Sequence, residues 1–125
     1  HASLEVTILS PEKHDHIMGL VQGVNHFSTL ALASCISRSG LKFEDFLNCS
    51  TQTFKQRLDR IKDILKQQSE LFSSLLIDNP HSREFMDEYL KSAGELMAIA
   101  GKKDKKAFGE FFETLREFFK NEKLS

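Results

Sequence analysis

Two polar side chains stand out in an otherwise apolar stretch near the N-terminus of the chain. Gln22 and His26 lie four residues apart, so on a helix they project from one face as neighbours. An amide and an imidazole can both donate and accept hydrogen bonds, and an imidazole can also become a cation. The spacing predicts a polar pocket in a helical core. From periodicity alone, a hydrogen-bonded core histidine is the alternative interpretation.

The helix that must carry this pair is predicted over residues 11–39. Ser10 is a good N-cap, Pro11 suits the first helical position, and Gly40 is a natural terminating glycine. Apolar residues recur at steps of three and four and predict one buried stripe. Its members are Ile17, Leu20, Val21, Val24, Ala31 and Cys35. At the usual rise per residue this helix is about 43 Å long, so we expect it to cross a whole domain or a subunit boundary.

Further helices are predicted along the rest of the chain, which makes the fold class all-α. The expected boundaries are a short turn at 43–47, a cap at Ser50 or Thr51, a continuation at 69–77, a restart at Asn79-Pro80, an end at Gly101 and a cap at Asp104. The helix after Thr51 is expected to carry Phe54, Leu58, Ile61 and Leu65 along one edge. Strand-like residues occur at 4–9 alone, and such a segment is too short to found a sheet.

Composition excludes several classes of function for this chain of 125 residues, which is long enough for one domain. The net charge is −1 and charges of both signs are interspersed, so the basic stripe that nucleic acid requires is absent. No apolar run approaches the ~18–20 residues that span a bilayer, and no signal pattern begins the chain, so no membrane partner is expected. Two cysteines make neither a disulfide framework nor a zinc site, which predicts a reducing cytoplasm.

His14 and His16 suggest a metal site at first sight. On a helix, residues two apart point in nearly opposite directions, so this pair cannot chelate an ion as histidines four apart do. The two side chains are expected on different faces of the helix, and the pair predicts no metal site.

Phenylalanine is over-represented, since the chain has 11 Phe, 1 Tyr and no Trp. Six of the phenylalanines lie in or near the last third of the chain, and they are Phe85, Phe108, Phe111, Phe112, Phe118 and Phe119. One small helix pair cannot readily bury so many rings by itself. Part of this surface is therefore expected to meet another chain or another domain, and a homodimer with a helical, phenylalanine-rich interface is predicted.

Several motifs, taken together, resemble one protein family. Ser-Pro-Glu at 10–12, His-Asp at 14–15, Gln22 and His-Phe-Ser-Thr at 26–29 are similar, in order and spacing, to the start of the C-terminal helical domain of prephenate dehydrogenases. The resemblance continues over nearly the whole chain in three further motifs. These are Asn48-Cys49-Ser50-Thr51 before Thr53-Phe54, Glu70-Leu71-Phe72, and Asp104-Lys105-Lys106-Ala107-Phe108.

The resemblance implies a fold and a domain organisation. Residues 10–125 are expected to form a helical dimerisation domain built around one long N-terminal helix, like the C-terminal domains of prephenate and 6-phosphogluconate dehydrogenases. Residues 1–9 are expected to be the connector from a nucleotide-binding domain. For His14 and Asp15 the resemblance implies a structural role near the junction of the two domains.

The resemblance also implies an activity for the full-length protein. In tyrosine biosynthesis, enzymes of this family oxidatively decarboxylate prephenate to 4-hydroxyphenylpyruvate with NAD or NADP, here expected in a cytoplasmic homodimer. This domain would supply the dimer interface and one wall of the substrate cleft, but no catalytic residue. Two alternatives stay open: an arogenate dehydrogenase domain, and a non-catalytic helical association or ligand-sensing module.

The nicotinamide cofactor is expected to bind outside this domain. None of the six glycines belongs to the G-x-G-x-x-G pattern of a phosphate-binding loop. The resemblance assigns the catalytic histidine of the family to the nucleotide-binding domain as well. This chain alone is therefore expected neither to bind NAD or NADP nor to turn over.

The resemblance implies that Gln22 and His26 bind substrate. At the position of His26, the family has a histidine that faces the interdomain cleft on the side where the substrate sits. A polar pocket, rather than a satisfied core histidine, is therefore the reading that the resemblance favours.

The third substrate-binding residue is expected on the second major helix. There the family usually has Gly-Arg-Ile, and its arginine binds a substrate carboxylate in a bidentate manner. A gapless reading places Lys-Asp-Ile at 62–64, and the acid Asp63 cannot replace a guanidinium. Arg60, three residues earlier on the same face, is expected to take this role, and Arg57 is the second candidate. The alternative is that both arginines are ordinary surface residues paired with acidic neighbours.

Overall fold

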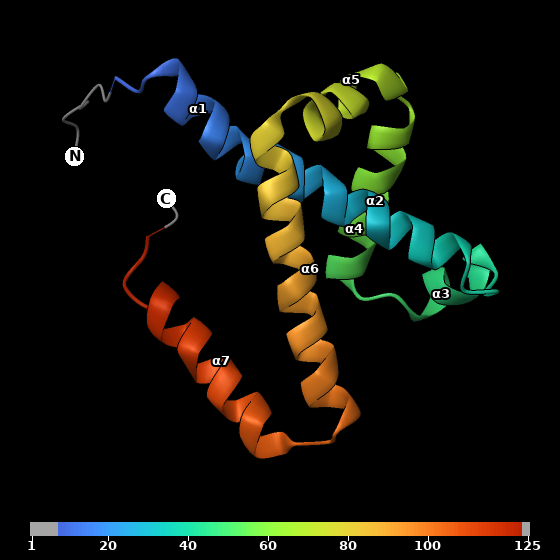
Figure 1. The fold of residues 1–125 in the computed structure, drawn as a ribbon. Helices are drawn as coiled ribbons and strands as arrows, with labels where there is room; N and C mark the ends of the chain where they lie inside the picture. The colour runs from blue at the N-terminus through green and yellow to red at the C-terminus, as the bar shows by residue number, and fades with distance from the viewer. Residues whose placement is uncertain (1–7, 124–125) are drawn as a thin grey trace. The chain divides into compact units, whose positions relative to one another are not determined.

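The computed structural model describes residues 8–123 of the chain. The regular elements of this part are all helical, which confirms the predicted all-α class (Figure 1). The chain divides into two compact units, an N-terminal unit of residues 1–87 and a C-terminal unit of residues 88–125. The strand-like segment predicted at 4–9 and the connector predicted at 1–9 lie mostly outside the described residues.

The N-terminal unit contains an uninterrupted helical rod followed by shorter helices. The rod consists of α1 (Pro11–Met18), the π-helical η1 (Gly19–Val24) and α2 (Asn25–Ser37). After it come α3 (Phe43–Cys49), α4 (Gln52–Leu65), α5 (Ser69–Ser73), the π-helical η2 (Ser74–Asp78) and the start of α6 (Pro80–Gly101). The C-terminal unit contains the remainder of α6 and α7 (Lys105–Phe119).

Side-chain caps begin the helices where the sequence predicts them. Ser10, Thr51 and Asp104 each accept a hydrogen bond from the backbone N–H three residues later, at 3.1, 3.2 and 2.9 Å. The Asn79 side chain accepts one from the His81 N–H at 3.0 Å. These local signals therefore place the helix starts correctly.

The long N-terminal helix is confirmed as a continuous rod, with one difference in its middle. The rod ends at Ser37, two residues before the predicted end, and Gly40 beyond it has a φ of +77°, in the left-handed region that favours glycine. Residues 19–24 form a π-helical turn. Because a π-turn closes its hydrogen bonds five residues apart instead of four, it rotates the helix faces away from those that a constant α-helical period predicts.

The stripe predicted to be buried on this rod is wrong for four of its six members. The exposed ones are Leu20, Val21, Ala31 and Cys35. The buried positions of η1 are instead Gly19 and Gly23. Hydrophobic periodicity identifies an apolar face, but it does not tell whether that face packs within the chain or against something else.

The two glycines are buried because the rod meets another segment at backbone distance. A Cβ atom at Gly19 would lie 2.8 Å from the carbonyl carbon of His81, and one at Gly23 would lie 2.6 Å from Ser82 Oγ. Ser82 is fully buried, and its hydroxyl donates to the Leu75 carbonyl oxygen at 2.8 Å. The π-turn therefore packs against the junction of η2 and α6 more closely than any side chain at these two positions would allow.

The apolar core of the N-terminal unit centres on α4. Leu58, Ile61 and Ile64 are buried there, together with Phe72 of α5. Leu65, which the sequence places on the same edge as Leu58 and Ile61, is 64% exposed. Ile64 and Leu65, three and four residues after Ile61, both lie near the helix face of Ile61. Packing against neighbouring helices buries Ile64 and leaves Leu65 exposed.

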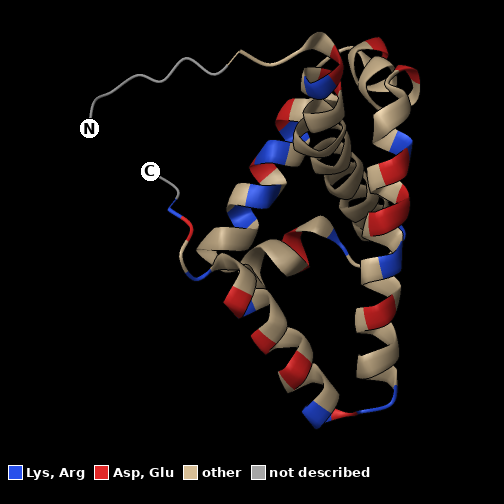
Figure 2. Cartoon of the chain, turned by 60° about the vertical axis from the view of Figure 1, so that its left-hand side comes forward, with Lys and Arg blue, Asp and Glu red and all other residues tan. Residues whose placement is uncertain are grey.

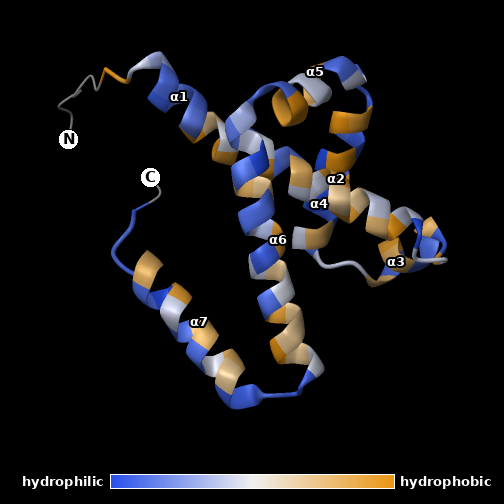
Figure 3. Cartoon of the chain, in the orientation of Figure 1, coloured by the Kyte–Doolittle hydropathy of each residue, from blue (hydrophilic) through white to orange (hydrophobic). Residues whose placement is uncertain are grey.

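The C-terminal unit has no buried side chain among its described residues, although both of its helices carry apolar residues (Figure 3). Ile99, Ala107 and Phe111 are half-buried. Large apolar side chains stay exposed, and they include Leu90, Leu96, Met97, Phe108, Phe112, Leu115, Phe118 and Phe119. These helices therefore present an apolar surface that the unit does not bury by itself.

The charged residues are mixed in sign along the described chain. Acidic and basic residues are interspersed along the helices (Figure 2). None of the described helices is both long and apolar enough to cross a membrane.

Candidate functional site

His26 lies in the first turn of α2, directly after the π-turn, and its side chain is half-buried. Its ring meets the ring of Phe72 edge-on, with 5.0 Å between the centroids. The Nδ1 atom is buried and has no hydrogen-bond partner among the described residues. Leaving a polar atom buried and unpaired costs about 1–3 kcal/mol, so such an atom calls for an explanation, and a functional role is one of the few that apply.

The imidazole of His26 is predominantly neutral at pH 7. Burial lowers the pKa of His26 from the usual 6.5, and the positive charge of Arg60 lowers it further. Arg60 of α4 therefore lies within electrostatic range of His26 of α2. A neutral imidazole can hydrogen-bond an anionic ligand while a nearby guanidinium neutralises the charge of that ligand.

The guanidinium of Arg60 is not engaged by an acidic neighbour within the described chain. Arg60 is exposed and forms no ion pair there. Asp63, at the position where the resemblance implies an arginine, pairs with Lys66 at 3.9 Å. Arg57 is also exposed, one turn earlier on α4. Of the two arginines, Arg60 is the one whose charge acts on His26.

Gln22 lies within η1, one turn before His26. Its side chain is exposed and forms no hydrogen bond with another described residue. The structure thus brings His26 and Arg60 into electrostatic range, but it shows no contact between Gln22 and either of them. The sequence predicts that Gln22 and His26 project side by side, as residues four apart do on an α-helix. The π-turn changes this, because Gln22 and His26 are not separated by a regular α-helical turn.

An apolar groove of about 360 Å³ lies beside Phe72 in the N-terminal unit. Leu30 of α2, Ile64 of α4 and Leu76 of η2 line it together with Phe72. His26 packs against Phe72 but is not one of the groove residues. The sequence did not predict that Phe72 packs against the His26 imidazole. Its place in the Glu70-Leu71-Phe72 motif was the only sequence feature that pointed to Phe72.

A family model accounts for most of the chain. Residues 10–117 match the family described as prephenate dehydrogenase, dimerization domain. The chain belongs to this family. The match runs from the N-cap of α1 into the last turns of α7, and it confirms the resemblance inferred from the motifs.

Three relatives of this prephenate dehydrogenase dimerization domain have similar sequences. The probable arogenate/prephenate dehydrogenase of Methanocaldococcus jannaschii is 25% identical over 118 residues, which are 94% of this chain and 26% of that protein. The T-protein of Enterobacter agglomerans is 22% identical over 111 residues, 89% of this chain and 30% of that protein. The T-protein of Haemophilus influenzae is 23% identical over 107 residues, 86% of this chain and 28% of that protein. No solved structure gives a significant match.

The chain spans only about a quarter to three tenths of the length of these relatives. The matched region contains both helices of the candidate site, α2 and α4. The match therefore includes both His26 and Arg60.

Proposed function

We propose that this chain is the dimer-forming and substrate-cleft domain of a prephenate dehydrogenase, which uses NAD or NADP to decarboxylate prephenate oxidatively to 4-hydroxyphenylpyruvate in tyrosine biosynthesis. The family match over residues 10–117 carries this proposal. Arogenate is the second candidate substrate, because the relative from M. jannaschii is named for both arogenate and prephenate. The two candidates differ in an amino group but share a carboxylate.

The proposed substrate-binding residues are Gln22, His26 and Arg60. The guanidinium of Arg60 would bind a substrate carboxylate, and the neutral imidazole of His26 would hydrogen-bond the same ligand beside it. The electrostatic effect of Arg60 on the pKa of His26 and the unpaired Nδ1 of His26 support this assignment. The exposed amide of Gln22 has no partner within the described chain and is free to reach a ligand from the preceding turn.

We also assign the protein to the cytoplasm. Cys35 and Cys49 are both free and exposed. Exposed thiols persist in reducing compartments and tend to oxidise outside them, which supports this assignment.

The complete reading frame tests the proposed function. An enzyme of this kind requires a nucleotide-binding domain whose G-x-G-x-x-G loop holds the cofactor phosphates. We expect that domain to precede residue 10, and the full-length protein to reduce NAD or NADP when prephenate or arogenate is added. A full-length protein that is inert with both substrates would favour the alternative, a non-catalytic association or sensing module.

The chain is expected to form a homodimer. The C-terminal unit leaves the apolar faces of α6 and α7 exposed, and stable homodimer interfaces are large and apolar. Sedimentation equilibrium at micromolar concentration should give twice the 14.3 kDa mass of one chain. Replacing Phe112 by glutamate should shift the equilibrium toward the monomer, whereas Lys91→Glu, an exposed charge change on α6, should not. A wild-type chain that stays monomeric at this concentration would contradict the prediction.

The 125-residue chain is expected to bind neither NAD nor NADP, because none of its glycines forms a phosphate-binding loop. Calorimetric titration of the chain with either cofactor should therefore give no heat of binding. The full-length protein, titrated in the same way, is the positive control. A dissociation constant for the chain below about 1 mM, which corresponds to some −4 kcal/mol, would place a nucleotide site in this domain after all.

A further inference from the structure

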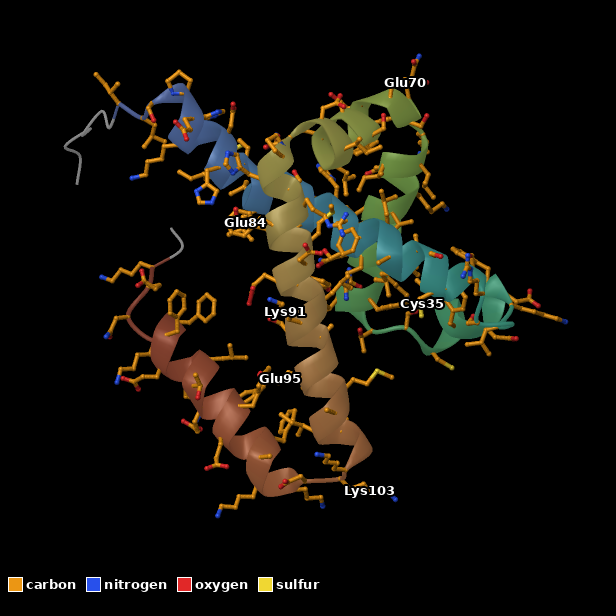
Figure 4. All side chains as sticks on the ribbon, viewed as in Figure 1. Cys35, Glu70, Glu84, Lys91, Glu95 and Lys103 are labelled. Carbon is orange, nitrogen blue, oxygen red and sulfur yellow. The ribbon has the colours of Figure 1, made fainter. Side chains whose placement is uncertain are left out.

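Three side chains with metal-binding atoms converge at the start of α6, away from the residues proposed to bind substrate. His16 of α1 meets Glu84 of α6, with 3.2 Å between Nε2 and Oε1. His81, also of α6, completes the group, and one ligand atom from each residue lies within 4.8 Å of the other two. Figure 4 labels Glu84 at this point of the structure. We propose that His16, His81 and Glu84 bind a zinc ion.

The donor set and its spacing suit zinc. Two imidazole nitrogens and one carboxylate oxygen are typical zinc ligands, at about 2.0–2.2 Å from the metal. In a tetrahedral site at such distances the ligand atoms are about 3.3 Å apart. The His16–Glu84 pair already has this separation, and the remaining approach of His81 requires side-chain rotation of the order of 1–2 Å. Three protein ligands leave the fourth position to water or to an exogenous ligand.

The imidazole of His81 is available to a metal. Its ring lies 4.7 Å from the ring of His16, centroid to centroid, and its nitrogens form no hydrogen bond with a described residue. His16 is half-buried and stacks on Phe85, with 5.1 Å between centroids. The contact with Phe85 restricts the orientation of the His16 ring, while its Nε2 still points to the carboxylate of Glu84.

The backbone that carries these ligands is held in place by short contacts. His81 packs directly over Gly19, where a Cβ atom would lie only 2.8 Å from the His81 carbonyl carbon. Two residues before His81, the Asn79 side-chain amide donates to the Asp15 carbonyl oxygen at 2.9 Å. Both contacts tie the start of α6 to the rod beside His16. Ligands held on rigid elements lose less conformational freedom when a metal binds.

The cluster borders an open hollow of about 520 Å³. Besides the three ligands, Ser10, Glu12 and Lys13 line this hollow. It admits a hydrated ion from solvent, and it gives the fourth coordination position room for water. The carboxylate of Glu12 adds negative charge near the ion, and the ammonium of Lys13 opposes it.

Calorimetric titration of the chelator-treated 125-residue chain with zinc chloride tests the proposal. We expect one zinc ion per chain, with a loss of affinity of at least about tenfold in His16→Ala and in His81→Ala. Glu84→Gln, which keeps the shape of the side chain but removes its charge, should also weaken binding. His14→Ala is the matched control: this imidazole is exposed, lies two residues from His16 and, within residues 8–123, pairs only with Asp15, at 3.7 Å.

Cobalt(II) provides a second readout that does not depend on heat. Bound at this site it should give the visible absorption bands of a four-coordinate nitrogen and oxygen environment, and His81→Ala should abolish them. Far-UV circular dichroism establishes that each variant is folded. The absence of zinc binding in the wild type, unchanged affinity in His81→Ala, or an equal loss in His14→Ala would each overturn the assignment. None of these results bears on the proposed dehydrogenase function.

Discussion

Replacing Gly23 by alanine is expected to lower the free energy of unfolding by about 1–3 kcal/mol. The new methyl group would stand 2.6 Å from Ser82 Oγ, well inside van der Waals contact. Ser82 cannot easily retreat, because it is fully buried and its hydroxyl is bonded to the Leu75 carbonyl. The π-turn and the start of α6 must therefore separate, and the contacts between them weaken.

Gly94→Ala is the matched control for this prediction. Gly94 is also helical, but a Cβ atom there would meet nothing within 4 Å. Alanine favours the helix over glycine by about 0.5–1 kcal/mol, so this variant should be more stable than the wild type. Urea unfolding at one fixed protein concentration measures both changes, because dimerisation makes apparent stability depend on concentration. Equal effects of the two substitutions would show that the close contact at Gly23 is not what stabilises this part of the fold.

In the full-length enzyme, His26→Ala and Arg60→Ala should each lower kcat/KM for prephenate by roughly 10- to 150-fold. This range corresponds to the loss of one hydrogen bond to a charged ligand, about 1.5–3 kcal/mol. Arg57→Ala is the matched control: this arginine is also exposed, one turn earlier on α4, but it does not act on the pKa of His26, so its loss should change kcat/KM little. A larger effect at Arg57 than at Arg60 would assign the carboxylate to the other arginine. Unchanged kinetics in His26→Ala would remove this residue from the substrate site.

The pKa of His26 shows whether the positive charge of Arg60 acts on the His26 imidazole in solution. Arg60→Ala should raise the pKa of His26 toward 6.5, because one of the two causes that lower it is removed while burial remains. NMR titration of the imidazole measures this shift directly. An unchanged pKa of His26 in Arg60→Ala would mean that the two side chains do not interact in solution.

The same pKa predicts how stability depends on pH. Because the pKa of His26 is lower in the folded chain than its usual 6.5, the unfolded chain takes up this proton first as the solution is acidified. The contribution of His26 to stability is therefore complete above pH 6.5 and is lost as the pH falls through the folded pKa. His26→Gln should lose less stability over that interval than the wild type does.

The sequence by itself determined the helix starts, the fold class and the family. Ser10, Thr51, Asn79 and Asp104 cap helices where they were expected, because a cap is an interaction within three residues of the same chain. The family could be inferred from ordered motifs along the chain, and the match over residues 10–117 confirmed it. Such signals are local or additive, so they can be recognised before any tertiary contact is known.

Only the tertiary structure decided which helix faces pack and which polar groups meet. Gly19 and Gly23, not the apolar stripe, form the buried face of η1, because a close approach between two backbones leaves no periodic apolar signal. The burial of Ile64 rather than Leu65 likewise depends on the helices that pack against α4.

The polar clusters show the same limit of sequence reasoning. His16 and Glu84 are 68 residues apart in the sequence, and their hydrogen bond depends on how the start of α6 lies beside α1. From the sequence, His16 could be compared only with His14, which points in nearly the opposite direction on the helix, and that pair predicted no metal site. Arg60 could be named as a candidate, but its electrostatic effect on His26 follows from the packing of α2 near α4. Distant residues meet through tertiary geometry, which no local spacing encodes.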